Sequence, residues 1–275
     1  MNGAEVRQKL RRGVYIVPTS LTVLNIFFGF TAIMLSMRAV REESLGDLFE
    51  AGRMFRLACW SLAAAALFDT FDGLVARLMK ATSEFGKEYD SIADVVTFGA
   101  APAVLVYAWA LHNWHRLGVG IAFLFLVAGS LRLARFNIQH GKADHRYFVG
   151  LPIPAGALTL AGIINYAPQP VQDQRFAAVM LVVTAGLAFA MVSTVRYRSQ
   201  KYANIHRRSS FTSLLMIALL VVILYRWPAE FWFIGSISYV VSGPLVKLWS
   251  IAFPHRPTPP GAESQPDHEP AAEQL

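Results

Sequence analysis

Residues 69–77 of the chain read DTFDGLVAR and residues 86–94 read GKEYDSIAD, which places four aspartates within 26 residues. Apolar runs precede the first stretch and follow the second, and both runs have the composition of membrane-spanning helices. An acidic side chain is costly to bury in a bilayer, so acids at this position point to a function.

The spacing within the first stretch predicts one polar face on a helix. Asp69, Asp72, Gly73 and Ala76 fall at i, i+3, i+4 and i+7, so they share a helix face. Arg77 lies close beside that face. The small residues keep the face open.

The second stretch predicts a helix that faces the first. Gly86, Asp90 and Asp94 recur every four residues, and the residues between the two stretches allow the chain to reverse direction. Carboxylates that converge on one point repel one another unless cations lie between them. An all-oxygen site suits Mg²⁺ or Mn²⁺ rather than zinc. The alternatives are acids that are ion-paired at helix ends, or acids that form a proton path.

The composition predicts an all-α, polytopic integral membrane protein. Hydrophobic residues make up 55% of the 275 residues and charged residues 16%, against about 25% charged in an ordinary soluble domain. The single Cys59 excludes an intramolecular disulfide and lies in an apolar run, where a small buried side chain is expected. The net charge of +7 has a topological explanation, and no basic and aromatic pattern typical of nucleic-acid binding is present.

Hydrophobic runs predict about eight transmembrane helices within a membrane domain at residues 19–250. The expected spans are about 19–37, 57–80, 95–111, 118–133, 151–167, 176–193, 211–227 and 231–249. Gly99 and Pro102 are expected to loosen or kink the third span. Residues 1–18 are basic and have apolar positions at helical spacing, which favours a short amphipathic segment on an anionic membrane surface. Residues 254–275 are rich in Pro and Glu and are predicted to be a disordered tail.

The distribution of basic residues predicts the orientation of this bundle. When alternate loops are assigned to opposite faces, 18 Lys and Arg lie on the face of the N-terminus and seven on the other. The positive-inside rule then places both termini and the acid cluster in the cytoplasm, within a cytoplasmic (inner) membrane.

The eight specified positions of the two stretches form the pattern D-x-x-D-G-x-x-A-R, eight residues, G-x-x-x-D-x-x-x-D. This pattern resembles the signature of the CDP-alcohol phosphotransferases, membrane enzymes that transfer a phosphatidyl or related group from a CDP-linked lipid to an alcohol. Less specific matches resemble the phosphatidylserine synthase branch of this family. They lie at residues 18–25 (PTSLTVLN), 132–137 (RLARFN) and 148–155 (FVGLPIPA).

The resemblance implies roles for individual residues. Asp69, Asp72 and Asp90 would bind divalent ions, Mg²⁺ or Mn²⁺, and Asp94 would complete the metal site and act as general base on the incoming hydroxyl. Asp69 and the remaining positions of the signature, with one residue of the first span, would also contact the CDP-lipid. These contact residues are Asn25, Asp69, Gly73, Ala76, Arg77 and Gly86.

Arg132 and Arg135 lie one turn apart at the predicted cytoplasmic end of the fourth span. They are either positive-inside anchors or ligand contacts, in which one binds the lipid phosphate and the other the carboxylate of serine.

The resemblance implies transfer of phosphatidyl from CDP-diacylglycerol to L-serine, which gives phosphatidylserine and CMP. It also implies that the protein forms a homodimer and that membrane lipids surround it. Within the family, the alternative is a sister enzyme that uses glycerol 3-phosphate, inositol phosphate or choline. From another class, the alternative is a cation or proton transporter that uses the same acids. A transporter has no reason to need Gly73, Ala76 and Arg77 at fixed spacing, so the full signature favours the enzyme. No single residue in the sequence specifies serine.

Overall fold

The computed structural model describes residues 3–78, 84–139, 147–193, 196–198, 226 and 228–252. In order, its elements are α1 (Gly3–Ser44), α2 (Leu48–Leu78), α3 (Glu84–Asp94), the π-helix η1 (Val95–Ala100), α4 (Ala101–Trp109), the 3₁₀-helix η2 (Leu111–Trp114), α5 (His115–Gln139), β1 (Tyr147–Val149), α6 (Ile153–Tyr166), α7 (Gln174–Val192), β2 (Arg196–Arg198) and α9 (Pro228–Ala252). The prediction of an all-α membrane protein is confirmed. The only departure among the described residues is a two-stranded antiparallel pair, in which Tyr147 faces Arg198.

Five of the described helical segments are long and apolar enough to cross a membrane: residues 20–44, 48–75, 84–109, 111–138 and 174–192. They correspond to the first, second, third, fourth and sixth predicted spans. The fifth is the shorter apolar helix α6, which has 14 residues. The seventh, 211–227, lies outside the described residues except for Arg226, and so does the tail at 254–275. The total of eight spans is therefore not confirmed.

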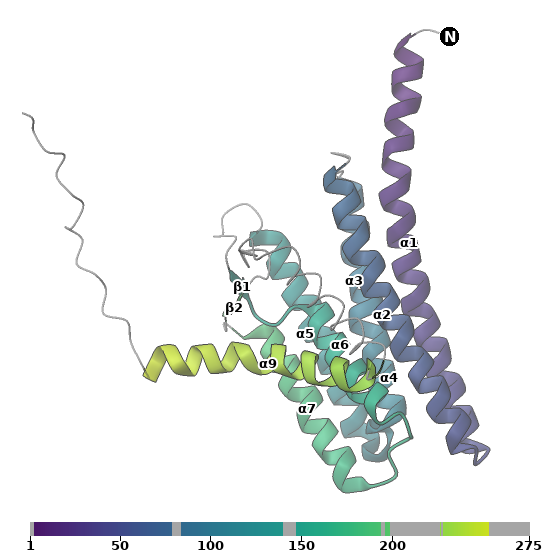
Figure 1. The fold of residues 1–275 in the computed structure, drawn as a ribbon, viewed down its shortest axis with the longest axis vertical. Coiled ribbons are helices and arrows are strands. Elements are labelled where there is room, and N and C mark those ends of the chain that lie inside the picture. Colours follow the sequence, from purple (N-terminus) through teal and green to yellow (C-terminus); the bar gives the residue numbers. More distant parts are fainter. Residues whose placement is uncertain are drawn as a thin grey trace, which may run out of the picture.

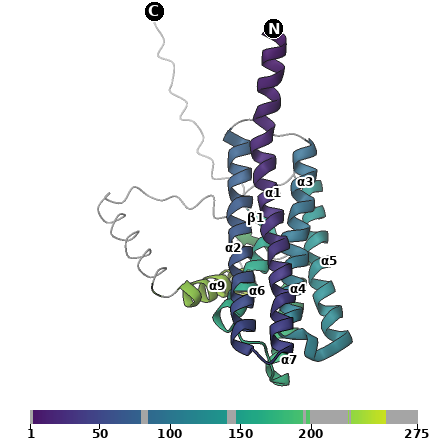
Figure 2. The ribbon, with the colours of Figure 1, turned by 90° about the vertical axis from the view of Figure 1, so that its right-hand side faces the viewer.

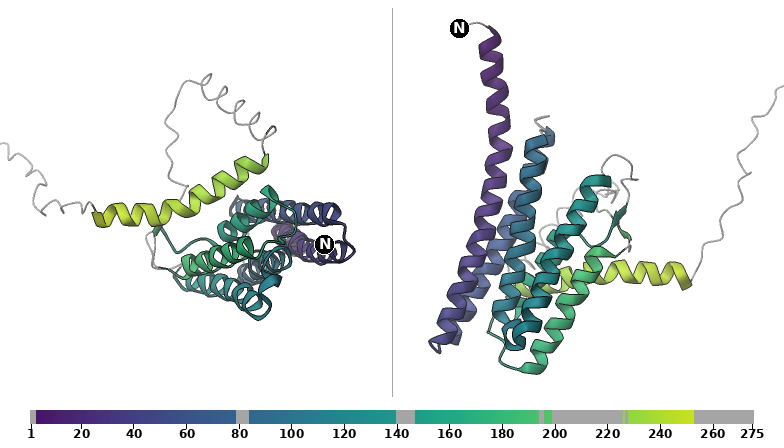
Figure 3. Two further views of the ribbon diagram at one scale, coloured as in Figure 1. Left: turned by 90° about the horizontal axis from the view of Figure 1, so that it is seen from below. Right: turned by 180° about the vertical axis from the view of Figure 1, so that it is seen from behind.

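Helix α9 covers the eighth predicted span but has a different course. In Figures 1 and 3 it lies across the side of the bundle instead of running along it. Trp232 anchors it, since the indole Nε1 donates to the carbonyl of Leu158 in α6 at 3.0 Å and the ring packs edge-on against Trp60 of α2 at 5.5 Å. Hydropathy along the chain cannot reveal this course, because an apolar helix packed across others has the same composition as one that spans.

Helix α1 is longer than predicted, because residues 3–18 continue into the first span without a break. Its 42 residues extend for about 63 Å, roughly twice the ~30 Å hydrocarbon core of a bilayer. Figure 2 shows the N-terminal end of α1 projecting beyond the rest of the bundle. The basic N-terminal segment is thus part of one long helix, and its position on a membrane surface stays a prediction.

A short turn reverses the chain between α1 and α2. Gly46 ends the first helix with a positive φ of 85°, a conformation that costs glycine little. Asp47 then starts α2, since its Oδ1 accepts a hydrogen bond from the backbone N–H of Glu50 at 2.9 Å. The two helices therefore run antiparallel and pack along most of their length, with the small residues Ala32, Ala51 and Ala58 fully buried.

Many of the large side chains on the outside of the bundle are apolar. Phe27, Met37, Leu67, Val182 and Phe189 are each more than half exposed. An exposed apolar surface of this extent is typical of contact with lipid, so it supports an integral membrane protein.

Candidate metal and CDP-lipid site

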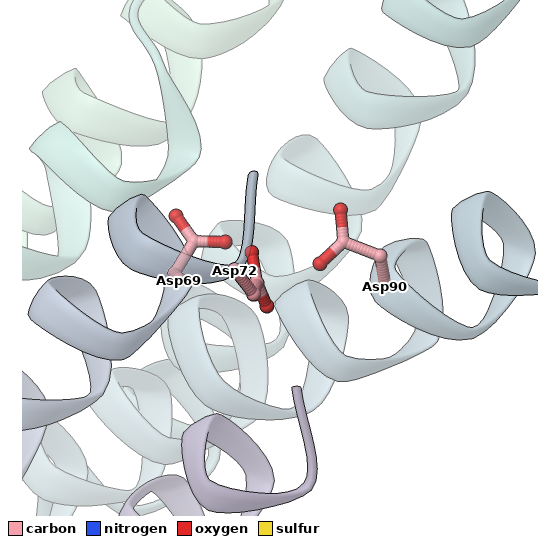
Figure 4. A group of neighbouring side chains, drawn as sticks. All are labelled: Asp69, Asp72 and Asp90. Atoms are coloured by element: carbon pink, nitrogen blue, oxygen red, sulfur yellow. The ribbon is translucent and has the colours of Figure 1, made fainter. Parts of the chain in front are cut away.

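Three of the four signature aspartates come together between α2 and α3. Carboxylate oxygens of Asp69, Asp72 and Asp90 all lie within 4.8 Å of one another. In Figure 4 the three carboxylates point into the same space, two from α2 and one from α3. The prediction that the two helices present their acids to each other is confirmed.

The fourth aspartate, Asp94, lies beside this group. Its carboxylate is close enough to that of Asp69 for a hydrogen bond, and it lies within electrostatic range of Asp90 and Asp72. One turn of α3 separates it from Asp90, as the spacing of four residues requires. Asp94 therefore lies at the edge of the cluster, beside Asp69.

The donor set fits a divalent cation that prefers oxygen. Three carboxylates at this separation offer only hard oxygen ligands and a high local negative charge. Asp90 Oδ1 and Asp94 Oδ1 are buried and have no hydrogen-bond partner among the described residues. Buried oxygens of this kind are costly without a cation or a donor, so the cluster could hold a metal ion.

The helix after Asp94 is loosened, as Gly99 and Pro102 predicted. Residues 95–100 form a π-helix, and α4 continues from Ala101 with Pro102 in its first turn. Single π-turns within helices occur often at functional sites. Here the wider turn follows the last carboxylate of the cluster directly.

Helix α1 forms a wall of the site, and it contacts both α2 and α3. Thr22 is 5% exposed, and its hydroxyl donates to Asp72 Oδ2 at 3.0 Å. Asn25, one turn further, is fully buried, and neither Oδ1 nor Nδ2 has a partner among the described residues. Gly29 brings this wall close, because a Cβ there would lie 2.5 Å from Thr97 Oγ1.

The other signature positions lie on the same two helices. Gly73 on α2 and Gly86 on α3 are half-buried. Ala76 and Arg77 have helical backbone in the last turns of α2, and their side chains lie outside what the structure describes. The signature positions therefore lie on the two helices where they were expected. The contact of Arg77 with phosphate stays a prediction.

Arg132 and Arg135, near the end of α5, have different surroundings. Arg132 is 8% exposed, its guanidinium lies 5.4 Å from the ring centre of Phe136, and its Nε has no described partner. It interacts electrostatically with Asp94 and Tyr239. Arg135 is directed elsewhere, since its Nη1 donates to the carbonyl of Val192 at the end of α7 at 3.3 Å. Only Arg132 of the pair is therefore turned to the acid cluster.

Two residues near the site were not assigned a role from the sequence. Thr22 lies in one of the weaker matching stretches, but its spacing alone does not reveal its contact with Asp72. Tyr239 is in α9 and packs against the core beside Arg132. No signal in the sequence predicts this contact, because it depends on the course of α9 across the bundle.

Fold and site together define a polytopic helical membrane protein with an all-carboxylate site fitted to a divalent cation. The family model described as CDP-alcohol phosphatidyltransferase matches residues 15–195, and the chain belongs to this family. The match contains the acid cluster, Asn25 and both arginines, whereas Tyr239 lies beyond it.

Three proteins that are similar to this chain share one name, CDP-diacylglycerol–serine O-phosphatidyltransferase. The protein of Helicobacter pylori is 32% identical over 210 residues, which cover 76% of this chain and 83% of the relative. That of Methanocaldococcus jannaschii is 35% identical over 194 residues, covering 70% and 78%. That of Bacillus subtilis is 37% identical over 129 residues, covering 47% and 67%.

Proposed function

We propose that this protein transfers phosphatidyl from CDP-diacylglycerol to the hydroxyl of L-serine, giving phosphatidylserine and CMP. The observation that carries the proposal is the convergence of Asp69, Asp72 and Asp90 from the complete eight-position signature. The names of the relatives support serine as the acceptor.

Asp69, Asp72 and Asp90 would hold the divalent cation, Mg²⁺ or Mn²⁺. When bound, the cation would neutralise negative charge on the two linked phosphates of the CDP-lipid. Asp94 completes the site and acts as general base. Its place at the edge of the cluster, beside Asp69, supports this division of roles.

The reaction exchanges one bond for another at the phosphorus of the phosphatidyl group. The serine oxygen forms a bond to this phosphorus, and the bond from phosphorus to the bridging oxygen of CMP breaks. The Asp94 carboxylate takes the proton of the serine hydroxyl, and CMP leaves with the electron pair. Proton transfer of this kind needs the base within hydrogen-bond reach of the hydroxyl.

The CDP-lipid lies along α1, α2 and the start of α3, in contact with Asn25, Asp69, Gly73, Ala76, Arg77 and Gly86. Asn25 supports this placement best, because a buried amide without a partner is costly until a ligand satisfies it. The half-buried Gly73 leaves room for a ligand to approach the backbone of α2.

Arg132 binds the anionic group of a substrate that lies nearest Asp94. We assign this group as the carboxylate of serine. Its buried guanidinium with an unpartnered Nε supports this role, since a buried cation is costly until an anion pairs with it. Arg135 instead caps the carbonyl end of α7. The metal ion and Arg77 would then bind the lipid phosphate.

The enzyme lies in the cytoplasmic membrane as a homodimer with the acid site and both termini in the cytoplasm. The orientation is supported by the excess of Lys and Arg on the face of the N-terminus. The dimer is supported by family resemblance.

The test is to incubate the purified protein with CDP-diacylglycerol, Mn²⁺ or Mg²⁺ and each of four acceptors, and to identify the lipid product by mass spectrometry. The acceptors are L-serine, glycerol 3-phosphate, inositol phosphate and choline. We expect phosphatidylserine and CMP in equal amounts, from serine only. A lipid product formed with another acceptor would show that this alcohol, and not serine, is the substrate. If no acceptor leads to release of CMP, the proposed transfer reaction is wrong.

A further inference from the structure

Helix α1 contributes a hydroxyl to the acid cluster that neither the signature nor the names of the relatives assign. Thr22 Oγ1 donates to Asp72 Oδ2 at 3.0 Å, and both side chains are 5% exposed. The two residues are 50 positions apart in the chain, so the contact joins two helices at the site itself.

Several other described threonines bond within their own helices, whereas the hydroxyl of Thr97 donates across helices to the backbone carbonyl of Asn25 at 3.3 Å. The hydroxyls of Thr31, Thr159 and Thr184 donate to the carbonyl four residues earlier in their own helices, at 2.7 to 2.8 Å. This is the usual arrangement of Thr in a membrane helix. The hydroxyl of Thr22 reaches a carboxylate on a neighbouring helix.

The Asp72 carboxylate needs such a partner to keep its orientation. Asp69 and Asp90 lie within 4.8 Å of it and repel it, and few contacts hold a short charged side chain in one rotamer. A donor on the side of α1 fixes one carboxylate oxygen and thereby sets the direction of the other. The close packing of α1 at Gly29 against Thr97 keeps the donor in place.

We propose that Thr22 is a positioning residue that orients Asp72 for binding of the divalent cation. The inference rests on the proposed function only in taking the acid cluster as the metal site. Residues that orient a metal ligand typically change metal affinity by about 10- to 100-fold when they are lost.

The experiment measures Mn²⁺ binding directly, by electron paramagnetic resonance of the purified protein without substrate. Thr22→Val keeps the shape of the side chain and removes the hydroxyl, and we expect the Kd for Mn²⁺ to rise by about 10-fold or more. Thr22→Ser keeps the hydroxyl and is expected to restore binding to within about 3-fold of the unaltered protein, on the scale of that same effect. Thr31→Val is the matched control, because it removes a hydroxyl from the same helix whose bond, within the described part of the chain, goes to the carbonyl of Phe27.

Two further variants keep the outcomes distinct. Thr22→Ala is a second variant without the hydroxyl, for use if Thr22→Val does not fold as judged by gel filtration and thermal unfolding. Asp72→Asn tests the metal site itself. Weakened binding in Asp72→Asn with normal binding in Thr22→Val and Thr22→Ala would overturn the role of Thr22 alone. Normal binding in all of them would overturn both the role and the acid cluster as the metal site.

Discussion

Asp94 differs from the other three signature aspartates in lying outside the group whose oxygens are mutually within 4.8 Å. We therefore expect Asp94→Asn to reduce kcat by about 10²- to 10⁴-fold, the usual contribution of a general base. Binding of CDP-diacylglycerol should change little, because Asp94 acts on the acceptor. Equal losses in lipid binding and in kcat would instead make Asp94 chiefly a metal ligand.

Asp69 and Asp90 approach the site from opposite helices, and each offers an oxygen to the same point. Asp69→Ala and Asp90→Ala are expected to weaken Mn²⁺ binding by more than the roughly 10- to 100-fold of an outer-shell change. Metal-dependent binding of CDP-diacylglycerol, measured by equilibrium dialysis, should fall with it. The control is Glu50→Ala, which removes a half-buried carboxylate that pairs with Arg53 at the other end of α2. A variant with unchanged metal dependence would show that its aspartate lies outside the metal site.

The different surroundings of Arg132 and Arg135 predict different kinetics for their lysine variants. Lysine keeps the charge but loses the planar pair of donors. Arg132→Lys should raise the KM for serine by about 10-fold, the effect of losing one charged hydrogen bond, with a smaller change in the KM for CDP-diacylglycerol. Arg135→Lys should leave the KM for serine unaltered, because Arg135 contacts the end of α7. The opposite pattern would exchange their roles, and no change in either would leave both as topology anchors.

At the scale of elements, the site depends on how closely α1 approaches the π-helix η1. A Cβ at Gly29 would lie 2.9 Å from the Cα of Thr97, so alanine there has to push the two backbones apart. We expect Gly29→Ala to lower stability by about 1 to 3 kcal/mol, as overpacking does. Gly120→Ala is the matched control, since no atom lies within 4 Å of its added Cβ. Thermal unfolding in detergent checks both, and equal midpoints would contradict the close contact.

The elements that the sequence predicted are those whose cause is local. The acid pairs were placed because spacings of three and four residues define a helix face, and Gly99 with Pro102 predicted the loosened turn. The continuous helix α1 was not predicted, because nothing in residues 3–18 or at Pro18 distinguishes a surface helix from the extension of a span. The contacts of Thr22 and Tyr239 could not be found either, because they depend on which helices pack side by side.

At the scale of the whole molecule, the orientation in the membrane decides whether the site can receive its substrates. Helix α2 begins at the turn that follows α1 and ends near the acid cluster, so its two ends offer two positions for labelling. Leu45 is 69% exposed in that turn, and Leu78 is 74% exposed at the end of α2 near the acids. If the positive-inside count is correct, Leu45 faces the outside of the cell and Leu78 the cytoplasm.

Cysteine labelling tests this orientation with little background, because the native Cys59 is fully buried. We expect a membrane-impermeant maleimide to label Leu45→Cys in intact spheroplasts. It should label Leu78→Cys only after the membrane is opened, and the protein without a new cysteine in neither case. The reverse pattern would place the acid cluster outside the cell, away from cytoplasmic CDP-linked substrates, and would contradict the proposed reaction at this site. The expected pattern also excludes a re-entrant α2, because the two ends of this helix must then lie on opposite sides of the bilayer.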